Sequence, residues 1–162
     1  MKRTLFFLLG AAFLAVSCTS AQPDTDEAVK SAVLRYTQGI IKAYRDLDPE
    51  ILASVTSQRQ LTKVDIVVQS FLQADRVMDS ELLSLDFKEI EGDGSSRRVR
   101  TVEKWRYKWV NVKSGDLVEG PREVRYEISY TLAREGESWI VEDVEIIDES
   151  RHIDVADSGA RP

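Results

Sequence analysis

One carboxylate in this sequence, that of Glu103, falls where it could act as an acid or base on a small molecule. Between residues 99 and 109 the side chains alternate in character, as they do in a strand with one buried face. Glu103 shares the apolar face with Trp105, Tyr107 and Trp109. A carboxylate is costly on such a face unless it is hydrated or paired, so this position is a weak candidate for a catalytic residue. A hydrogen bond from Tyr36, Tyr126 or Tyr130 would support it.

The same aromatic residues predict a cleft that could bind a ligand. Its lining would consist of Tyr36, Glu103, Trp105, Tyr107, Tyr126 and Tyr130. The sequence favours the alternative, in which both Glu103 and the aromatic residues have a structural role. Glu103 would then lie near a strand end, reach water or pair with an arginine, and the aromatic rings would fill a core between sheet and helices.

Other catalytic and metal-binding arrangements are missing from the sequence. The only histidine is His152, which excludes a histidine-based triad or a multi-histidine metal site within the domain. There is no glycine-rich phosphate loop and no H-E-x-x-H motif. The acidic run from Asp143 to Glu149 lacks the glycine spacing of a calcium loop. We therefore expect no metal and no cofactor, and a protein that is more readily a binder than an enzyme.

The N-terminus has the features of an export signal. Lys2 and Arg3 precede an apolar run from Leu5 to Val16, which is shorter than the roughly 20 residues that span a bilayer. The run ends in Leu14-Ala15-Val16-Ser17-Cys18, which resembles a bacterial lipobox. The resemblance implies cleavage before Cys18 and attachment of acyl chains, such as palmitate, to that residue. The alternative is an ordinary secretory signal beside an incidental cysteine.

This interpretation divides the chain into four parts. Residues 1–17 form the signal peptide, 18–23 a lipid-anchored tether, 24–148 the folded domain, and 149–162 a flexible polar tail. Thr19 stands where an aspartate often marks inner-membrane retention, so we expect the outer membrane, facing the periplasm, in a cell with two membranes. Loss of Lys2 and Arg3 would make the net charge of −6 two units more negative. Such a chain is poorly suited to bind nucleic acid, and its membrane contact would be through the lipid.

Three helices are predicted in the first half of the domain. Asp24 and Glu27 have the spacing of a capping box, and apolar residues then follow at helical spacing as far as Asp46 or Leu47. Asp48 and Pro49 predict a short second helix that ends at Val55. Ser57 predicts the start of a third helix, whose apolar side extends to Met78.

From Leu82 onward the period changes to two, which predicts strands. Turns at residues 92–96, 113–116 and 134–137 separate four of them. Helices followed by an antiparallel meander give an α+β fold, with one long and two shorter helices packed on a curved four-stranded sheet. Basic residues alternate with the apolar face of the second strand, and we expect them to pair with Glu123 and Glu127 on the next strand. These basic residues are Arg98, Arg100, Lys104, Arg106 and Lys108.

This order of elements resembles the nuclear transport factor 2-like superfamily. The closing hairpin Gly136-Glu137-Ser138-Trp139-Ile140-Val141 is similar to the G-x-W-x-I/V ending common in these domains. The resemblance implies a cone-shaped domain whose open end holds an enzyme pocket, a ligand site or a protein interface, so the fold does not select the function.

We expect a non-catalytic envelope lipoprotein whose cone binds a protein partner or a small apolar ligand. One alternative is an isomerase, dehydratase or hydrolase that uses Glu103. A second is a dimerisation or assembly module, and the sequence is compatible with a monomer or a homodimer.

Overall fold

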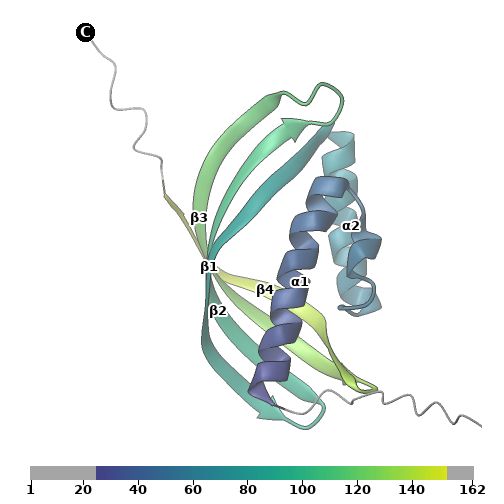
Figure 1. Cartoon of the computed structure of the whole chain (residues 1–162), viewed down its shortest axis with the longest axis vertical. Helices are drawn as coiled ribbons and strands as arrows, with labels where there is room; N and C mark the ends of the chain where they lie inside the picture. Colours follow the sequence, from purple (N-terminus) through teal and green to yellow (C-terminus); the bar gives the residue numbers. More distant parts are fainter. Residues whose placement is uncertain (1–24, 153–162) are drawn as a thin grey trace, which may run out of the picture.

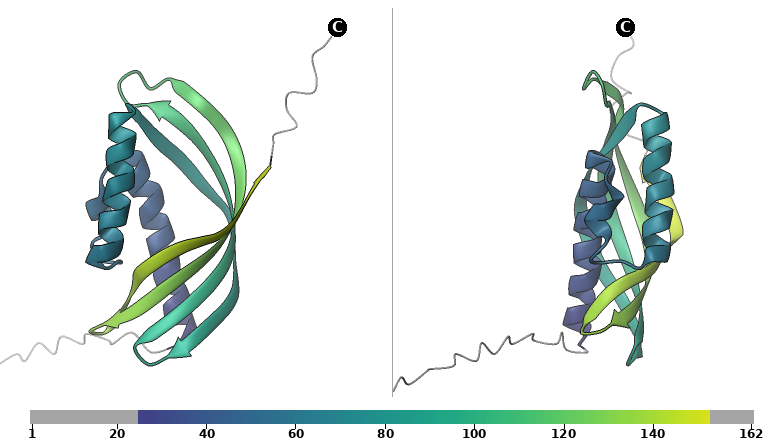
Figure 2. Two further views of the ribbon diagram at one scale, coloured as in Figure 1. Left: turned by 180° about the vertical axis from the view of Figure 1, so that it is seen from behind. Right: turned by 90° about the vertical axis from the view of Figure 1, so that its right-hand side faces the viewer.

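A computed structural model describes residues 25–152, which form two α-helices, one 3-10 turn and one antiparallel sheet. The sheet has four strands in the order β1-β2-β3-β4, so each strand pairs with its neighbours in sequence. Both helices lie on the concave side of the strongly curved sheet (Figures 1 and 2). The predicted α+β class and the four-stranded meander are confirmed. The elements are α1 (Asp26–Asp46), η1 (Pro49–Leu52), α2 (Gln58–Gln73), β1 (Arg76–Asp93), β2 (Ser96–Asn111), β3 (Leu117–Glu135) and β4 (Ser138–His152).

A cap at Asp24 would start the first helix at residue 25, but α1 begins one residue later, at Asp26. Thr25 is the N-cap, and its hydroxyl accepts a hydrogen bond from the backbone N–H of Ala28 at 3.2 Å. Thr25 and Ala28 have the N-cap to N3 spacing that satisfies one free N–H of the first turn. The helix ends at Asp46, as expected, because Leu47 takes a left-handed conformation with φ 55°. Tyr36, Thr37, Gly39 and Ala43 are all on the buried side of α1.

The predicted second α-helix is wrong, because this segment makes only one 3-10 turn, η1. Asp48 caps it as expected, accepting from the N–H of Glu50 at 3.0 Å. The chain beyond Leu52 then bonds to strand β4. The N–H of Val141 donates to the carbonyl of Val55, and the N–H of Ser57 donates to the carbonyl of Val141, each at 3.0 Å. These bonds form a bridge between Thr56 and Val141, and Ser57 is extended, so the helix cannot continue.

Ser57 caps α2 as predicted, but the helix ends at Gln73 and does not reach Met78. The Ser57 hydroxyl accepts from the N–H of Gln60 at 3.2 Å. Asp75 takes a φ of 50°, which turns the chain into β1. Met78 therefore lies on a strand, paired with Trp109, although its spacing also fits the helix. Within the described part of the chain, neither α-helix is both long and apolar enough to cross a membrane.

The strands are long, and irregularities in their pairing interrupt the register. Strand β1 shifts register against β2 between Leu82 and Ser84 and again between Phe87 and Glu89. Such bulges increase the local twist and allow a sheet to bend around the helices that pack on it. Strand β4 continues to His152, so residues 149–152 belong to the sheet and not to the tail predicted for 149–162.

The core fills the space between the two helices and the half of the sheet around the closing hairpin. Val29 and Val33 of α1 and Leu52 of η1 are fully buried there, together with Leu132 and Trp139 of the sheet. Burial of apolar side chains of this size stabilises a domain by roughly 1.5–3 kcal/mol each. The opposite half of the concave face is not filled in the same way, and the site described below lies there.

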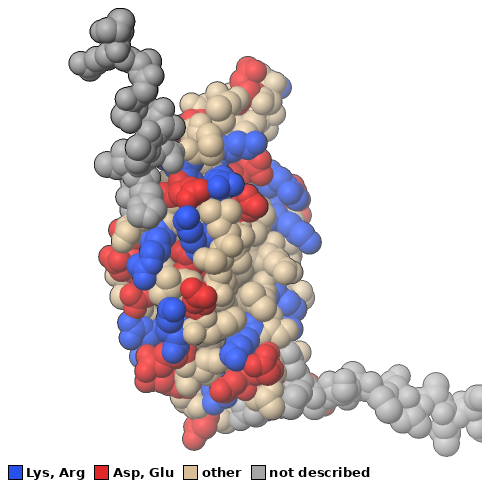
Figure 3. All heavy atoms as spheres, turned by 60° about the vertical axis from the view of Figure 1, so that its left-hand side comes forward, with Lys and Arg blue, Asp and Glu red and all other residues tan. Residues whose placement is uncertain are grey.

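The convex face of the sheet has ion pairs between strands, as the alternation predicts. Arg100 pairs with Glu127, and both Lys104 and Arg106 pair with Glu123. Acidic and basic side chains are interspersed over this face (Figure 3). Exposed pairs of this kind contribute about 0.2–1 kcal/mol each. Their main effect is to make the outer face a poor surface for apolar association.

Candidate functional site

A cavity of about 430 Å³ lies between the helices and the concave face of the sheet. Helix α1 contributes Tyr36 and Tyr44, helix α2 contributes Gln60 and Lys63, and the remaining walls come from the four strands. All six residues expected to line a ligand site are at this cavity. They are Tyr36, Glu103, Trp105, Tyr107, Tyr126 and Tyr130. The alternation of β2 and β3 explains the position of the five that lie on these strands, because every second side chain points inward. Tyr36 lies on the buried side of α1.

Glu103 lies at the inner end of the cavity, in the middle of β2, and its side chain is completely buried. Three neutral groups donate hydrogen bonds to its carboxylate. The hydroxyls of Thr101 and Tyr130 donate to Oε1 at 2.7 and 2.8 Å, and the indole N–H of Trp105 donates to Oε2 at 2.8 Å. The structural alternative considered for Glu103 is therefore wrong on each point. The residue is not at a strand end, does not reach water, and forms no ion pair with an arginine of the described chain.

The hydrogen bonds around Glu103 fix the roles of its neighbours. An indole N–H can only donate, and the hydroxyls of Thr101 and Tyr130 also donate here, so both carboxylate oxygens of Glu103 are acceptors. Burial, and then the nearby Glu103 carboxylate, raise the pKa of the Tyr130 hydroxyl well above its usual value of 10.0. Tyr130 is therefore protonated at any physiological pH and remains a donor. Three of the four lone-pair directions of Glu103 are occupied by the protein.

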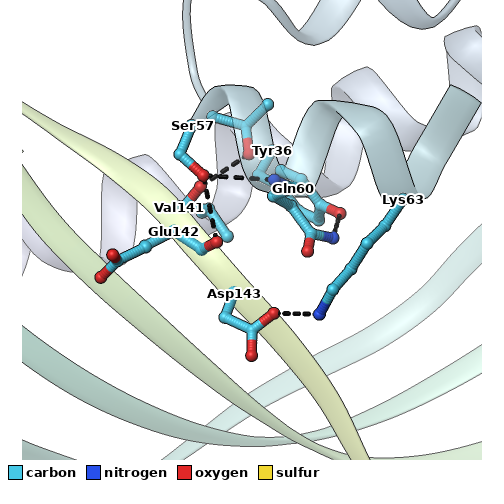
Figure 4. Close-up of polar contacts among 8 residues, drawn as sticks. Tyr36, Ser57, Gln60, Lys63, Val141, Glu142 and Asp143 are labelled. Carbon is cyan, nitrogen blue, oxygen red and sulfur yellow. Dashed lines mark hydrogen bonds and ion pairs between the residues drawn. The ribbon is translucent and has the colours of Figure 1, made fainter.

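A second buried polar pair lies where α1 faces α2. The side-chain amide of Gln60 donates from Nε2 to the Tyr36 hydroxyl at 2.7 Å (Figure 4). Burial raises the pKa of Tyr36 far above its ordinary value. Gln60 is only 5% exposed, and its Oε1 has no hydrogen-bond partner in the described part of the chain. Turning the amide over would only exchange the two atoms, so one polar atom of Gln60 has no protein partner in either orientation.

An ion pair links helix α2 to the edge strand at the border of the cavity. Lys63 donates to the carboxylate of Asp143 (Figure 4). The bond from Lys63 lowers the pKa of Asp143 below its usual value. Nearby, the hydroxyl of Thr56 donates to the Val141 carbonyl at 2.6 Å, and that of Ser57 donates to the Glu142 carbonyl at 3.1 Å. These contacts fix the start of α2, and with it Gln60 and Lys63, against β4.

The aromatic residues divide between the core and the cavity. Trp139, with an exposed fraction of 1%, is a core residue as expected, and Tyr130, at 2%, belongs to the core but also borders the cavity. Tyr107, Trp109 and Tyr126 are half-buried and line the cavity. The Trp109 ring packs edge-on against Phe71 of α2, with centroids 4.9 Å apart, and fixes the wall on that side. Burial also raises the pKa of Tyr44, which lines the cavity from α1, to about 12.

Sequence reasoning missed several lining residues on α2 and β1. Gln60 was detectable, because it lies four residues before Val64 and eight before Val68, on the apolar stripe of its helix. A polar residue on a buried stripe indicates either a hydrogen-bonded core group or a site. Met78 could not be found, because it was assigned to the predicted third helix, and Ser80 lay between that helix and the first predicted strand. Thr101 was placed on the correct face but was not recognised as a donor to Glu103.

The described residues contain no group of three histidine, cysteine, aspartate or glutamate side chains that could hold a metal ion. The polar groups at the cavity are instead hydroxyl, amide, indole, ammonium and carboxylate groups. They can bind a ligand by hydrogen bonds and charge.

The sequence matches no family model and no curated protein. Among solved structures, the intermembrane space region of the chloroplast protein ARC6 is similar, with a TM-score of 0.63 and 17% identity over 76% of this chain and 98% of that one. A hexachlorocyclohexane dehydrochlorinase, LinA Type2, aligns with a TM-score of 0.49 and 11% identity over 83% of this chain and 97% of that one. An uncharacterised protein with a cystatin-like fold from Caulobacter vibrioides aligns at 0.46 and 10%, over 75% and 91%.

At 17% identity, the similarity to the ARC6 region concerns the fold alone. It agrees with the architecture described above, in which two α-helices pack into the concave face of a four-stranded antiparallel meander. The chain therefore shares an α+β fold with the ARC6 region, and a shared fold does not select a function.

Proposed function

We propose that this domain is a non-catalytic binding module that holds a small organic molecule in the cavity between its helices and sheet. The observation that carries the proposal is the combination of aromatic walls with buried polar groups at one end. Cavities that bind small molecules have volumes of roughly 300–1,000 Å³ and a mainly apolar lining with a few convergent polar groups. The cavity here, at about 430 Å³, has both properties.

The unpartnered polar atom of Gln60 supports this proposal. Leaving a buried polar atom without a partner costs roughly 1–3 kcal/mol, and proteins seldom retain such an atom without compensation. Gln60 lines the cavity beside Tyr36, whose hydroxyl accepts from it and keeps its own hydrogen available to donate. A ligand with one polar group could bond to both residues.

The state of Glu103 argues against a catalytic role. A general base must reach the proton that it removes, at about 2.6–3.2 Å. The Glu103 side chain is completely buried and already accepts three hydrogen bonds from the protein. It therefore serves better as a residue that positions Tyr130 and Trp105 than as an acid or base for a substrate.

Native mass spectrometry on the full chain, purified gently from its source, tests the proposal. We expect a small molecule to be retained by the wild-type protein and by Glu81→Phe, but not by Ser80→Phe. Ser80 lines the cavity, so a phenylalanine there would fill it. Glu81, the next residue of β1, points to the outer face and pairs with Arg106, so it is the matched control. Retention by all three proteins, or by none of them, would contradict binding in this cavity.

The second part of the proposal concerns the location of the domain, and it rests on the lipobox resemblance at Cys18, outside the described residues. We propose that a lipid on this cysteine anchors the protein to the cell envelope, in the outer membrane of a cell with two membranes. Cys18→Ser is expected to move the protein from the membrane fraction to the soluble envelope fraction. Cell fractionation and the mass of the N-terminal peptide would measure this. Unchanged membrane attachment without a lipid mass would contradict the proposal.

A further inference from the structure

Lys63 and Glu103 both line the cavity but have different surroundings. Lys63 forms an ion pair with Asp143 across the border of the cavity. The carboxylate of Glu103 has no basic side chain beside it in the described part of the chain, and its three hydrogen bonds come from neutral groups. The cavity therefore has a buried carboxylate that no basic group offsets.

The hydrogen bonds to Glu103 extend this negative character into the aromatic walls. Trp105 donates its indole N–H to Oε2, and Tyr130 donates its hydroxyl to Oε1. A donor group that bonds to a carboxylate is polarised, and its ring gains electron density. The face of an aromatic ring already carries negative potential, which attracts a cation. Trp105 and Tyr130 should attract a cation more strongly than they would without Glu103.

The surroundings of the cavity already contain one contact of this type. The guanidinium of Arg76 lies 4.0 Å from the centroid of the Trp109 ring, at the start of β1. Trp109 is itself part of the cavity wall. Tyr107 and Tyr126 provide further aromatic groups around the same space.

We propose that the ligand is a small organic cation, with an amine or quaternary ammonium group held by the aromatic walls in front of Glu103. This inference rests on the proposed function and specifies its ligand class. Glu103 acts as a positioning residue here, because it does not touch the ligand but orients and polarises Trp105 and Tyr130. An anionic ligand is disfavoured, because Lys63, the lysine at the cavity, is already paired with Asp143.

The test compares choline with 3,3-dimethylbutan-1-ol, which has the same shape without the positive charge. Both are titrated by calorimetry and by tryptophan fluorescence into the full chain in a neutral maltoside detergent. A desolvated cation–π contact favours the charged probe, so we expect choline to bind at least about tenfold more tightly than the neutral alcohol. Ser80→Phe, which fills the cavity, should abolish binding of choline.

A Glu103→Gln variant separates the role of the carboxylate from that of the rings. It keeps a side chain of similar shape, and we expect the preference for choline over the alcohol to fall several-fold while binding of the alcohol is retained. Equal binding of the two probes by the wild-type protein would overturn the cationic ligand class but leave the proposed binding function intact. Binding of neither probe would also overturn it, and retention of a neutral or anionic molecule in the mass spectrometry above would identify the correct class.

Discussion

Glu103→Leu is expected to lower the free energy of unfolding by about 2–4 kcal/mol. Leucine is close to glutamate in size but cannot accept a hydrogen bond. The substitution would leave the indole N–H of Trp105 and the hydroxyls of Thr101 and Tyr130 without their acceptor in a buried place. Each unsatisfied donor costs roughly 1–3 kcal/mol. Part of this loss is offset, because leucine avoids the cost of burying a carboxylate. Chemical denaturation followed by tryptophan fluorescence would measure the difference.

Two further variants serve as controls for this result. Glu103→Gln keeps one acceptor oxygen, so its loss should be smaller, at about 1–2 kcal/mol. Glu89→Gln changes an exposed partner of Arg100 and should alter stability by less than about 0.5 kcal/mol. A Glu103→Leu protein as stable as the wild type would mean that the carboxylate is kept at a cost to stability. In that case its role would be in binding alone.

The sequence predicted the faces of the strands well, because the side-chain period of a strand is fixed by its backbone. Strand β2 illustrates this. Glu103, Trp105 and Tyr107 face the cavity, whereas Arg100 and Lys104 form ion pairs on the convex side. The alternation alone was enough to bring the five expected lining residues of β2 and β3 to one concave surface, although it could not decide whether a core or a cavity would form there.

The errors arose where contacts distant in sequence override local preference. Residues 49–55 have the cap and proline of a helix, yet the chain from Val55 to Ser57 bonds to Val141, more than 80 residues later. Met78 fits the apolar spacing of α2, but pairing with β2 places it in β1, which begins at Arg76. No short stretch of sequence contains both partners of either contact. Boundaries set by such contacts could not have been predicted from periodicity.

The surface of the sheet bears on the assembly-module alternative. A stable apolar interface needs a face with few charges at its centre. The convex face instead carries the paired charges of Arg100, Lys104 and Arg106 (Figure 3). The concave face is covered by the two helices (Figure 1). The structure therefore gives more support to a ligand in the cavity than to a second copy packed on the sheet.

Trp139 is expected to respond very differently to alanine and to phenylalanine. It is 1% exposed in the centre of the core, so Trp139→Ala should lower the free energy of unfolding by about 3–5 kcal/mol through the cavity that it leaves. The indole N–H has no hydrogen-bond partner in the described part of the chain, so phenylalanine would remove an unsatisfied donor while retaining most of the apolar volume. Trp139→Phe should therefore cost no more than about 1 kcal/mol. Denaturation curves of the two variants would measure both effects. A large loss with phenylalanine would show that the N–H contributes a bond in solution, and that the tryptophan of the closing hairpin is required for more than its size.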